Sequence, residues 1–369
     1  MHPRNASKKI KKYQAMKISS NLISLINKPI RIVPLMSVNK KIKLDNMVKI
    51  CTHSGSFHAD ESLAVYLLKL LPKYSQAELV RSRNPEDWES SDIVVDVSGK
   101  YDGVKYFDHH QREFDTTFNE NYKTKLSSAG LVYKHFGKEI IKEVLKLEDG
   151  NPNIELLYDK IYKEFVESLD ANDNGISNYP KDVSPKFTDK NITLPSIVSR
   201  LNPSWNESCT DADYDRQFLK SSELMGTVFV SLLEGYGKSW LPAKSIVAKA
   251  FDNRFEVDKS GEILVLDQFC PWKEHLYNIE KENNAEGLIK FVLFKDSSGK
   301  WRVSTVSVTS TSFEFRLGLP QELRGLRDQE LSEKSGIDGC IFIHATGFIG
   351  GANTKEAVLE LARLSLNTK

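Results

Sequence analysis

Apolar and polar positions between residues 47 and 169 follow two alternating periods. Short apolar runs rich in β-branched and aromatic side chains predict strands over residues 48–52, 78–81, 92–97 and 104–107. Apolar positions spaced by three or four residues predict helices over residues 63–71, 127–137, 139–147 and 154–169. Strands that alternate with helices predict an α/β domain, in which helices cover both faces of a parallel sheet.

The second half of the chain has a different pattern. Residues 213–233 predict a long helix, which we expect to close at Gly235 and Gly237. Apolar runs separated by turn signals then predict strands over residues 245–251, 255–257, 263–266, 289–294, 301–308 and 340–344, before a C-terminal helix over 355–366. We therefore expect a smaller C-terminal α+β domain. The predicted division is an extension at 1–46, an α/β domain at 47–212, a connector helix at 213–240 and a C-terminal domain at 241–369.

Composition narrows the class of protein. The chain has 369 residues, of which 40% are hydrophobic, so it can bury the cores of two domains. Lys plus Arg number 51 against 50 Asp plus Glu, which argues against a uniformly basic nucleic-acid clamp. The four cysteines form no CxxC pair, which argues against a zinc knuckle or a disulfide scaffold and favours a reducing compartment. No apolar run approaches the ~18 residues that a membrane-spanning helix needs.

Residues 1–44 contain eleven Lys or Arg and no Asp or Glu. Basic, acid-free leaders of this type are typical of mitochondrial transit peptides. The run of residues 8–12, KKIKK, would also serve as a nuclear address or a nucleic-acid-binding tail, and an extension without any address is a third interpretation. If translation starts near Met47, a cytoplasmic protein is expected.

Most of the candidate metal-binding and catalytic residues follow the ends of predicted strands. His53, His58 and Asp60 lie on a glycine-containing turn between the first strand and the first helix. Such a turn places backbone N–H groups and the positive helix end beside a bound phosphate or a carboxylate-ligated metal. The alternative is a turn that only caps the helix.

Further acids and histidines occur at three other places. Asp96 ends the apolar run at 92–97, where an ionised carboxylate is costly unless it is paired, metal-bound or exposed at the strand end. Asp108, His109 and His110 follow the fourth predicted strand, where ligands bind in open α/β sheets. A helix then runs into an acidic segment in which two residues fit the spacing of a ligand, Asp170 and Asp173.

These side chains form a carboxylate and imidazole set without a thiolate, which suits Mn²⁺ or Mg²⁺ better than structural zinc. Two cations ~3.5–4 Å apart, bridged by a carboxylate, would hold a hydroxide for attack on phosphorus and stabilise the leaving oxygen. We therefore expect two ions in the site.

The order of these motifs resembles the DHH phosphoesterase superfamily, which includes family II pyrophosphatases, the exonuclease RecJ and oligoribonucleases. Eight segments between residues 47 and about 366 resemble more closely the melanocyte-proliferating-gene family of eukaryotic 3′–5′ RNA exonucleases. They are HSGSFHADE, RSRNPEDW, VVDVSG, YFDHHQR, SSAGLVY, DANDNGIS, RGLRD and IHATGFIGG. The resemblance implies a DHH-type domain, a C-terminal substrate-binding domain and an active site in the cleft between them, with mitochondrial and nuclear placement among family members.

The resemblance also implies roles for single residues. One metal would be held by His53, His58 and Asp96, and the other by Asp60, Asp96, His109 and Asp170, so that Asp96 is the bridge. Asp108 would orient His109, and His110 would face the scissile phosphate. The superfamily pattern at the first motif is Asp-x-Asp, whereas this chain has His58, Ala59 and Asp60, which lowers the negative charge of the site.

Seven residues of the C-terminal domain are candidates for holding the nucleic-acid backbone: Arg302, Arg316, Arg324, Arg327, His344, Gly350 and Gly351. The two glycines are expected on a phosphate-sized loop between strand and helix. The alternative for this set is surface salt bridges and turn glycines.

The function implied is a metal-dependent 3′–5′ exoribonuclease in RNA processing and turnover, with single-stranded RNA as substrate, no membrane partner and a possible dimer. One alternative is a hydrolase of pyrophosphate or short oligonucleotides, because its metal core would be the same. A third interpretation is a weakly catalytic RNA-binding protein of the same fold, motivated by His58.

Overall fold

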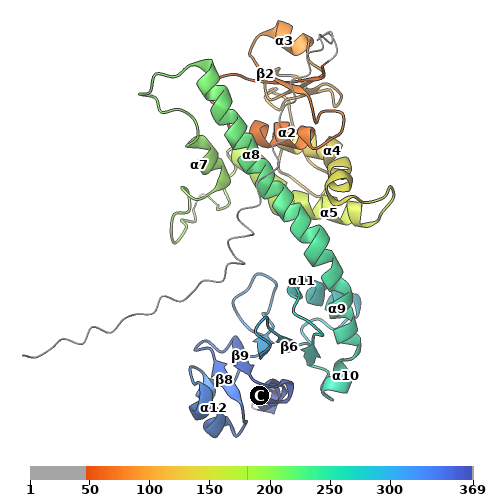
Figure 1. Ribbon diagram of the computed structural model, residues 1–369, viewed down its shortest axis with the longest axis vertical. Coiled ribbons are helices and arrows are strands. Elements are labelled where there is room, and N and C mark those ends of the chain that lie inside the picture. Colours follow the sequence, from red (N-terminus) through yellow and green to blue (C-terminus); the bar gives the residue numbers. More distant parts are fainter. Residues whose placement is uncertain (1–46, 181, 368–369) are drawn as a thin grey trace, which may run out of the picture. The chain divides into compact units, whose positions relative to one another are not determined.

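The computed structural model describes residues 47–180 and 182–367 (Figure 1). The basic extension at residues 1–46, with its predicted targeting role, lies outside the described residues. No helix among the described residues has both the length and the apolar character needed to cross a bilayer.

The first sheet has four parallel strands in the order β2-β1-β3-β4. They are β1 (Lys49–Thr52), β2 (Glu78–Arg81), β3 (Ile93–Val95) and β4 (Tyr106–Phe107). The central strands β1 and β3 are buried almost throughout, as expected for strands with both faces covered. Because the strands are parallel, the segments leaving β1, β3 and β4 begin at the same edge of the sheet. These segments carry His53, Asp96 and Asp108.

Helices follow the strands, as the sequence pattern predicts. They are α2 (Ala59–Lys69), α3 (Pro85–Glu89), α4 (Ser128–Leu145), α5 (Asn153–Ile161), α6 (Glu167–Asp173) and α7 (Leu194–Ser199), with a π-helical turn η1 (Tyr162–Val166) between α5 and α6. Leu63 and Leu67 of α2 share one core with Leu131 of α4 and Phe229 of a later helix. Burying each such side chain contributes roughly 1.5–3 kcal/mol. The predicted fold class, an α/β protein built on a parallel sheet, is confirmed.

The predicted connector helix is longer than expected. Its backbone stays helical through α8 (Asp211–Gly235), the π-helical turn η2 (Tyr236–Trp240) and α9 (Leu241–Asp252) (Figure 1). Gly235 and Gly237 therefore do not end the helix. Gly237 serves packing instead, because a Cβ there would lie 2.5 Å from Cδ1 of Leu145. The strand predicted over residues 245–251 is wrong, since these residues belong to α9.

The second sheet has five strands in the order β5-β6-β7-β9-β8. They are β5 (Ile263–Val265), β6 (Phe291–Lys295), β7 (Trp301–Thr305), β8 (Cys340–Ile343) and β9 (Ile349–Ala352). Within this second sheet, only the described pair β5–β6 is parallel, and the other three described pairs are antiparallel. The other elements of this part are α10 (Arg254–Val257), α11 (Lys273–Glu282), η3 (Gln321–Leu323), α12 (Asp328–Ser335) and α13 (Lys355–Asn367).

Two predictions for this part are wrong. Residues 255–257 lie in the short helix α10 rather than in a strand. Gly350 and Gly351 lie inside β9 rather than on a loop, so they form no phosphate-sized cradle between strand and helix. A Cβ on Gly351 would lie 2.6 Å from Nη1 of Arg302 and 2.8 Å from Cε1 of Phe342. This glycine therefore lets two large side chains lie against the strand.

Candidate metal centre

The turn from β1 into α2 carries the first group of candidate ligands. His53 and Asp60 are buried, and His58 is exposed at the N-cap of α2. Glu61 completes a capping box, because its Oε1 accepts a hydrogen bond from the backbone N–H of His58 at 2.7 Å. Asp60 and Glu61 thus lie in the first turn, where the helix dipole stabilises negative charge.

Asp96 lies at the centre of the site. Its φ is +57°, a left-handed conformation that costs a residue other than glycine about 1–3 kcal/mol and that clusters at functional sites. Its Oδ1 accepts a hydrogen bond from the Ser128 hydroxyl at 2.9 Å. Its Oδ2 lies 3.5 Å from Nε2 of His53, and its Oδ1 lies 3.5 Å from Nε2 of His109. The strained backbone therefore places one carboxylate between two imidazoles.

Ligand atoms gather in three overlapping groups, each within 4.8 Å. The groups are His53 with His58, Glu61 and Asp96; Asp96 with His109 and His110; and Asp60 with His109 and Asp173. Asp96 and His109 are each shared by two groups, so neighbouring cations at this edge of the sheet would have ligands in common.

The Asp60 carboxylate shows most directly that the site suits a cation. The residue is 1% exposed, and neither carboxylate oxygen has a hydrogen-bond partner among the described residues. Burial raises its pKa well above the usual value, and the nearby carboxylates of Asp96, Asp173 and Glu61 raise that pKa further. A buried carboxylate without a partner is costly, and a bound divalent cation removes that cost.

Nearby carboxylates raise the pKa values of the His53 and His109 imidazoles. Burial alone would lower the pKa of His53, but hydrogen bonds to Asp96 and Glu61 outweigh burial and raise it to about 9. Burial likewise opposes protonation of His109, whose pKa Asp173 and Asp96 raise to about 10. Both imidazoles therefore lie among carboxylates that favour a positive charge at this place. Oxygen and nitrogen donors without sulfur fit Mn²⁺ or Mg²⁺.

Asp170 and Asp173, the two acids that fit the spacing of a metal ligand, lie in different surroundings. Asp173 Oδ2 lies 3.0 Å from Nε2 of His109, within the cluster. Asp170 is fully buried elsewhere: its Oδ1 accepts from the backbone N–H of Ser127 at 2.9 Å, and its Oδ2 accepts from the Tyr162 hydroxyl at 3.0 Å. Burial raises its pKa to about 7, although the Ser127 and Tyr162 donors lower it. Asp170 thus anchors the start of α4, whereas Asp173 lies beside His109 in the cluster.

Asp108 does not orient His109 as expected. Its Oδ1 lies 2.7 Å from Nδ1 of His110, and its Oδ2 accepts from the backbone N–H of Gly99 at 2.6 Å. The side chain of His110 is 62% exposed. Asp108 therefore holds His110 at the solvent side of the cluster, while His109 is oriented by Asp173 and Asp96.

Sequence reasoning missed Glu61. This residue is completely buried, its Oε1 lies 3.0 Å from Nε2 of His53, and its Oε2 has no hydrogen-bond partner among the described residues. Its position three residues after His58 is the capping-box position, which explains a glutamate there without any metal. The available signal was a fourth ionisable residue within nine positions of sequence.

The C-terminal candidates have different environments. Arg316 forms a buried pair with Glu280 at 2.6 Å, and Arg302 pairs with Asp296 at 2.5 Å. Such pairs leave less of each guanidinium for a nucleic-acid backbone. Arg324 and Arg327 have no carboxylate partner among the described residues, and His344 is exposed with Nδ1 2.9 Å from the Thr346 hydroxyl. Arg302, Arg327 and Gly351 all contact Phe342, whereas the guanidinium of Arg316 is held by Glu280.

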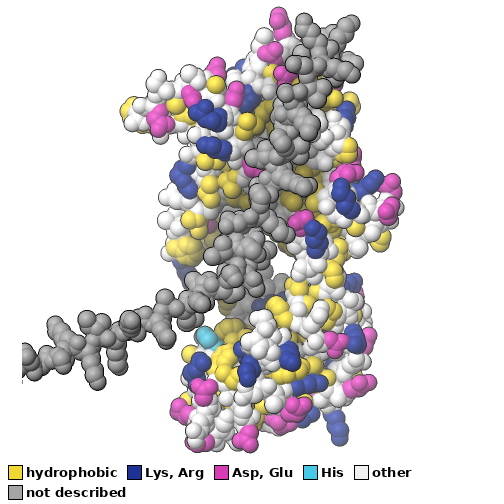
Figure 2. All heavy atoms as spheres, viewed as in Figure 1, with side chains coloured by type: hydrophobic (Ala, Val, Ile, Leu, Met, Phe, Trp, Pro, Cys, Tyr) yellow, Lys and Arg dark blue, Asp and Glu magenta, His cyan; other side chains and the backbone are white. Residues whose placement is uncertain are grey.

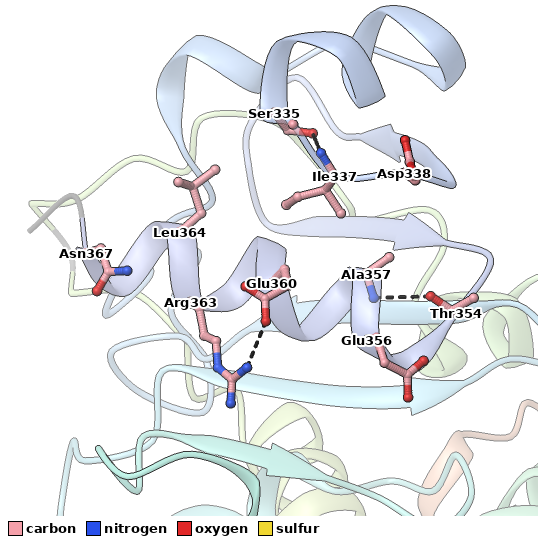
Figure 3. Close-up of a pocket in the computed structure, with 11 residues that line it drawn as sticks. Ser335, Ile337, Asp338, Thr354, Glu356, Ala357, Glu360, Arg363, Leu364 and Asn367 are labelled. Atoms are coloured by element: carbon pink, nitrogen blue, oxygen red, sulfur yellow. Dashed lines mark hydrogen bonds and ion pairs between the residues drawn. The ribbon is translucent and has the colours of Figure 1, made fainter.

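A hollow of about 510 Å³ lies beside α13 (Figure 3). Arg363 on its wall pairs with Glu360 at 2.7 Å and with Asp258 at 2.9 Å. No histidine lines this hollow. Its cation is already paired, and the candidate metal ligands lie instead at the edge of the first sheet.

The fold and the cluster define an α/β protein with a candidate carboxylate–imidazole metal centre at the carboxyl edge of a parallel sheet. The chain belongs to the MYG1 exonuclease family, so the family resemblance expected from the motifs is confirmed. The family, described as "Uncharacterised protein family (UPF0160)", matches residues 49–366.

Two relatives show the extent of the similarity. The MYG1 protein of Saccharomyces cerevisiae is 64% identical over 337 residues, which cover 90% of this chain and 100% of the yeast protein. The MYG1 exonuclease of Homo sapiens is 46% identical over 325 residues, which cover 86% of this chain and 85% of the human protein. A solved structure of RecJ from Thermus thermophilus in complex with Mn²⁺ aligns with a TM-score of 0.22 at 14% identity, covering 86% of this chain and 52% of RecJ.

Proposed function

We propose that the chain is a metal-dependent 3′–5′ exoribonuclease that uses two Mn²⁺ or Mg²⁺ ions. The observation that carries the proposal is the buried Asp60 carboxylate without a partner, next to a shared Asp96 and His109. The exonuclease name of the human relative, 46% identical to this chain, supports hydrolysis of nucleic acid. The two-ion arrangement is supported by the overlapping ligand groups.

Some side chains of the cluster would hold the cations, and His110 would contact the phosphate. One ion would be held by His53, His58, Glu61 and Asp96, and the other by Asp60, His109 and Asp173, with Asp96 beside His109 as the ligand that both could share. Bound divalent ions supply an activated water and stabilise the leaving oxygen. His110 is exposed at the edge of the cluster, and its hydrogen bond to Asp108 raises its pKa. A protonated His110 can donate a hydrogen bond to a phosphate oxygen there.

Exposed aromatic side chains in the C-terminal part support a single-stranded substrate. Phe313 is 95% exposed and Phe348 is 38% exposed, with the His344 ring 4.8 Å from the Phe348 ring. Bases of single strands stack on such rings, and Lys or Arg nearby holds the backbone. On the face drawn in Figure 2, hydrophobic side chains lie next to Lys and Arg side chains over the region of β8, β9 and α12.

We propose a role in RNA processing or turnover in the mitochondrion or nucleus, motivated by the basic leader at residues 1–44. Assembly as a dimer belongs to the same proposal, and native gel filtration with light scattering tests it.

Incubation of the purified full chain with single-stranded RNA tests the activity. With Mn²⁺, 5′-labelled RNA should shorten one nucleotide at a time, and 3′-labelled RNA should release labelled mononucleotide at once. A matched DNA strand and pyrophosphate test the substrate class, and excess chelator should stop the reaction. Immediate release of mononucleotide from the 5′ label, internal cleavage, or hydrolysis of pyrophosphate alone would contradict the proposal.

A further inference from the structure

We propose that Arg83 binds a backbone phosphate of the substrate at the edge of the metal centre. Arg83 follows β2 and is exposed beside the turn that carries His53. Its Nε donates to the carbonyl of Ser54 at 3.3 Å, and its Nη2 lies 3.3 Å from Nδ1 of His53. The guanidinium therefore lies directly beside a candidate metal ligand. The inference rests on the proposed nuclease function.

Arg83 has no acidic partner in the part of the chain that the structure describes. Among the described residues, no carboxylate lies within ion-pair distance of its guanidinium. This is unusual for a cation next to a cluster that contains Asp60, Glu61 and Asp96. The two hydrogen-bond contacts of Arg83 are both 3.3 Å long, and neither uses Nη1, for which residues 47–180 and 182–367 offer no acceptor. A guanidinium is a planar fork of donors that matches two phosphate oxygens, so the unused edge suits an anion.

Arg81, two residues before Arg83, makes the contacts of an arginine with a structural role. Its side chain is 2% exposed, its Nη1 pairs with Asp215 at 2.9 Å, and its Nη2 donates to the carbonyl of Gly55 at 2.7 Å. Its guanidinium also lies 4.5 Å from the centre of the Phe218 ring. Arg81 thus already ties the metal-binding turn to α8, and Arg83 is not needed for that purpose.

Charge favours a phosphate as the ligand of Arg83. The four carboxylates of Asp60, Glu61, Asp96 and Asp173 would repel a polyanionic backbone until divalent cations balance them. A cation held 3.3 Å from His53 supplies attraction at the rim of the same cluster. The geometry points to the scissile phosphate or the phosphate next to it, because His53 itself belongs to a ligand group.

The test compares Arg83→Gln and Arg83→Lys with a matched control, Arg216→Gln. Arg216 is an exposed arginine that pairs with Asp213 on α8, so its loss removes one positive charge without touching the cluster. All variants are made in the full chain. Calorimetry measures Mn²⁺ affinity, and on the Mn²⁺-loaded protein it measures binding of inorganic phosphate. Steady-state rates on single-stranded RNA are measured across a salt series.

We expect Arg83→Gln to bind inorganic phosphate at least ~10-fold more weakly and to raise KM for RNA by a similar factor. The slope of log(kcat/KM) against log salt should fall by about 0.7, the value for one phosphate contact on a single strand. Mn²⁺ affinity should change less than about two-fold, and Arg83→Lys should retain part of the phosphate affinity. Arg216→Gln should leave every quantity near wild type.

Two results would overturn the inference. A loss of Mn²⁺ affinity in Arg83→Gln that matches the loss of activity would make Arg83 a support for the His53 turn. Unchanged phosphate binding, KM and salt slope would leave it without a role in substrate binding. If the wild-type chain does not hydrolyse RNA at all, the proposed function fails, while phosphate binding by the wild type and Arg83→Gln still decides the role of Arg83.

Discussion

Replacing Asp60 by Asn should stabilise the metal-free protein while abolishing stabilisation by metal. Asp60 is 1% exposed, and neither of its oxygens has a hydrogen-bond partner among the described residues. Leaving a buried polar group unsatisfied costs about 1–3 kcal/mol, and more when the group is charged. Asn has the same shape without the charge, and its NH₂ can donate to the neighbouring Glu61 carboxylate. We therefore expect the free energy of unfolding to rise by about 1–3 kcal/mol in chelator.

The stabilisation by Asn should grow with pH. The folded pKa of Asp60 lies above its ordinary value of 3.8, so the unfolded state loses this proton first and wild-type stability falls as the pH rises above about 4. The amide side chain of the variant cannot ionise and escapes that loss. The difference in unfolding free energy between variant and wild type should therefore be small near pH 4 and larger at pH 7.

Thermal and urea unfolding measure both effects. One kcal/mol shifts Tm by about 2–4 °C in domains of ~150–250 residues, so Asp60→Asn should melt roughly 2–12 °C above wild type in chelator. Mn²⁺ at 100 times its Kd should stabilise wild type by about 2.7 kcal/mol and the variant by much less. Ser62→Ala, on the same helix, is the matched control and should not raise Tm. A lower Tm for Asp60→Asn in chelator, or equal stabilisation of both proteins by Mn²⁺, would refute the reasoning.

Three further outcomes are expected. Asp96→Asn should lose at least one bound metal by elemental analysis and reduce single-turnover RNA hydrolysis by several orders of magnitude, and a normal rate would contradict a shared ligand. His110→Ala should keep its metal content while turnover falls by about 10²–10⁴-fold, and metal loss equal to that of Asp96→Asn would make His110 a ligand. A chain starting at Met47 should fold and hydrolyse RNA like the full chain, because the core cluster and all candidate ligands follow that residue, and loss of folding would place the leader in the domain.

The parallel sheet and the order of the motifs were predictable because they depend on local patterns. Buried parallel strands have continuous apolar runs, and polar residues directly after them gather at one edge of the sheet. His53, Asp96 and His109 could be placed together for this reason. The helix over residues 245–251 was not predictable from its short apolar run, which a strand and a buried helix share.

The finer parts of the site depend on tertiary contacts. Asp170 and Asp173 lie about one helical turn apart, so spacing alone cannot separate them. Ser127 and Tyr162 bind Asp170 and leave Asp173 to face His109, and the Ser127 contact joins residues 43 positions apart. Glu61 was hidden because a capping glutamate and a metal ligand have the same sequence signature.

Anomalous X-ray diffraction from crystals grown with Mn²⁺ tests the metal centre most directly. At the manganese edge, two peaks should lie on either side of the Asp96 carboxylate, one near His53 and Glu61 and the other near Asp60, His109 and Asp173. Asp96→Asn crystals grown in the same way should lose at least one of the two peaks. Strong peaks only at other places in the chain, or none at this edge of the sheet in Mn²⁺, would contradict the metal centre.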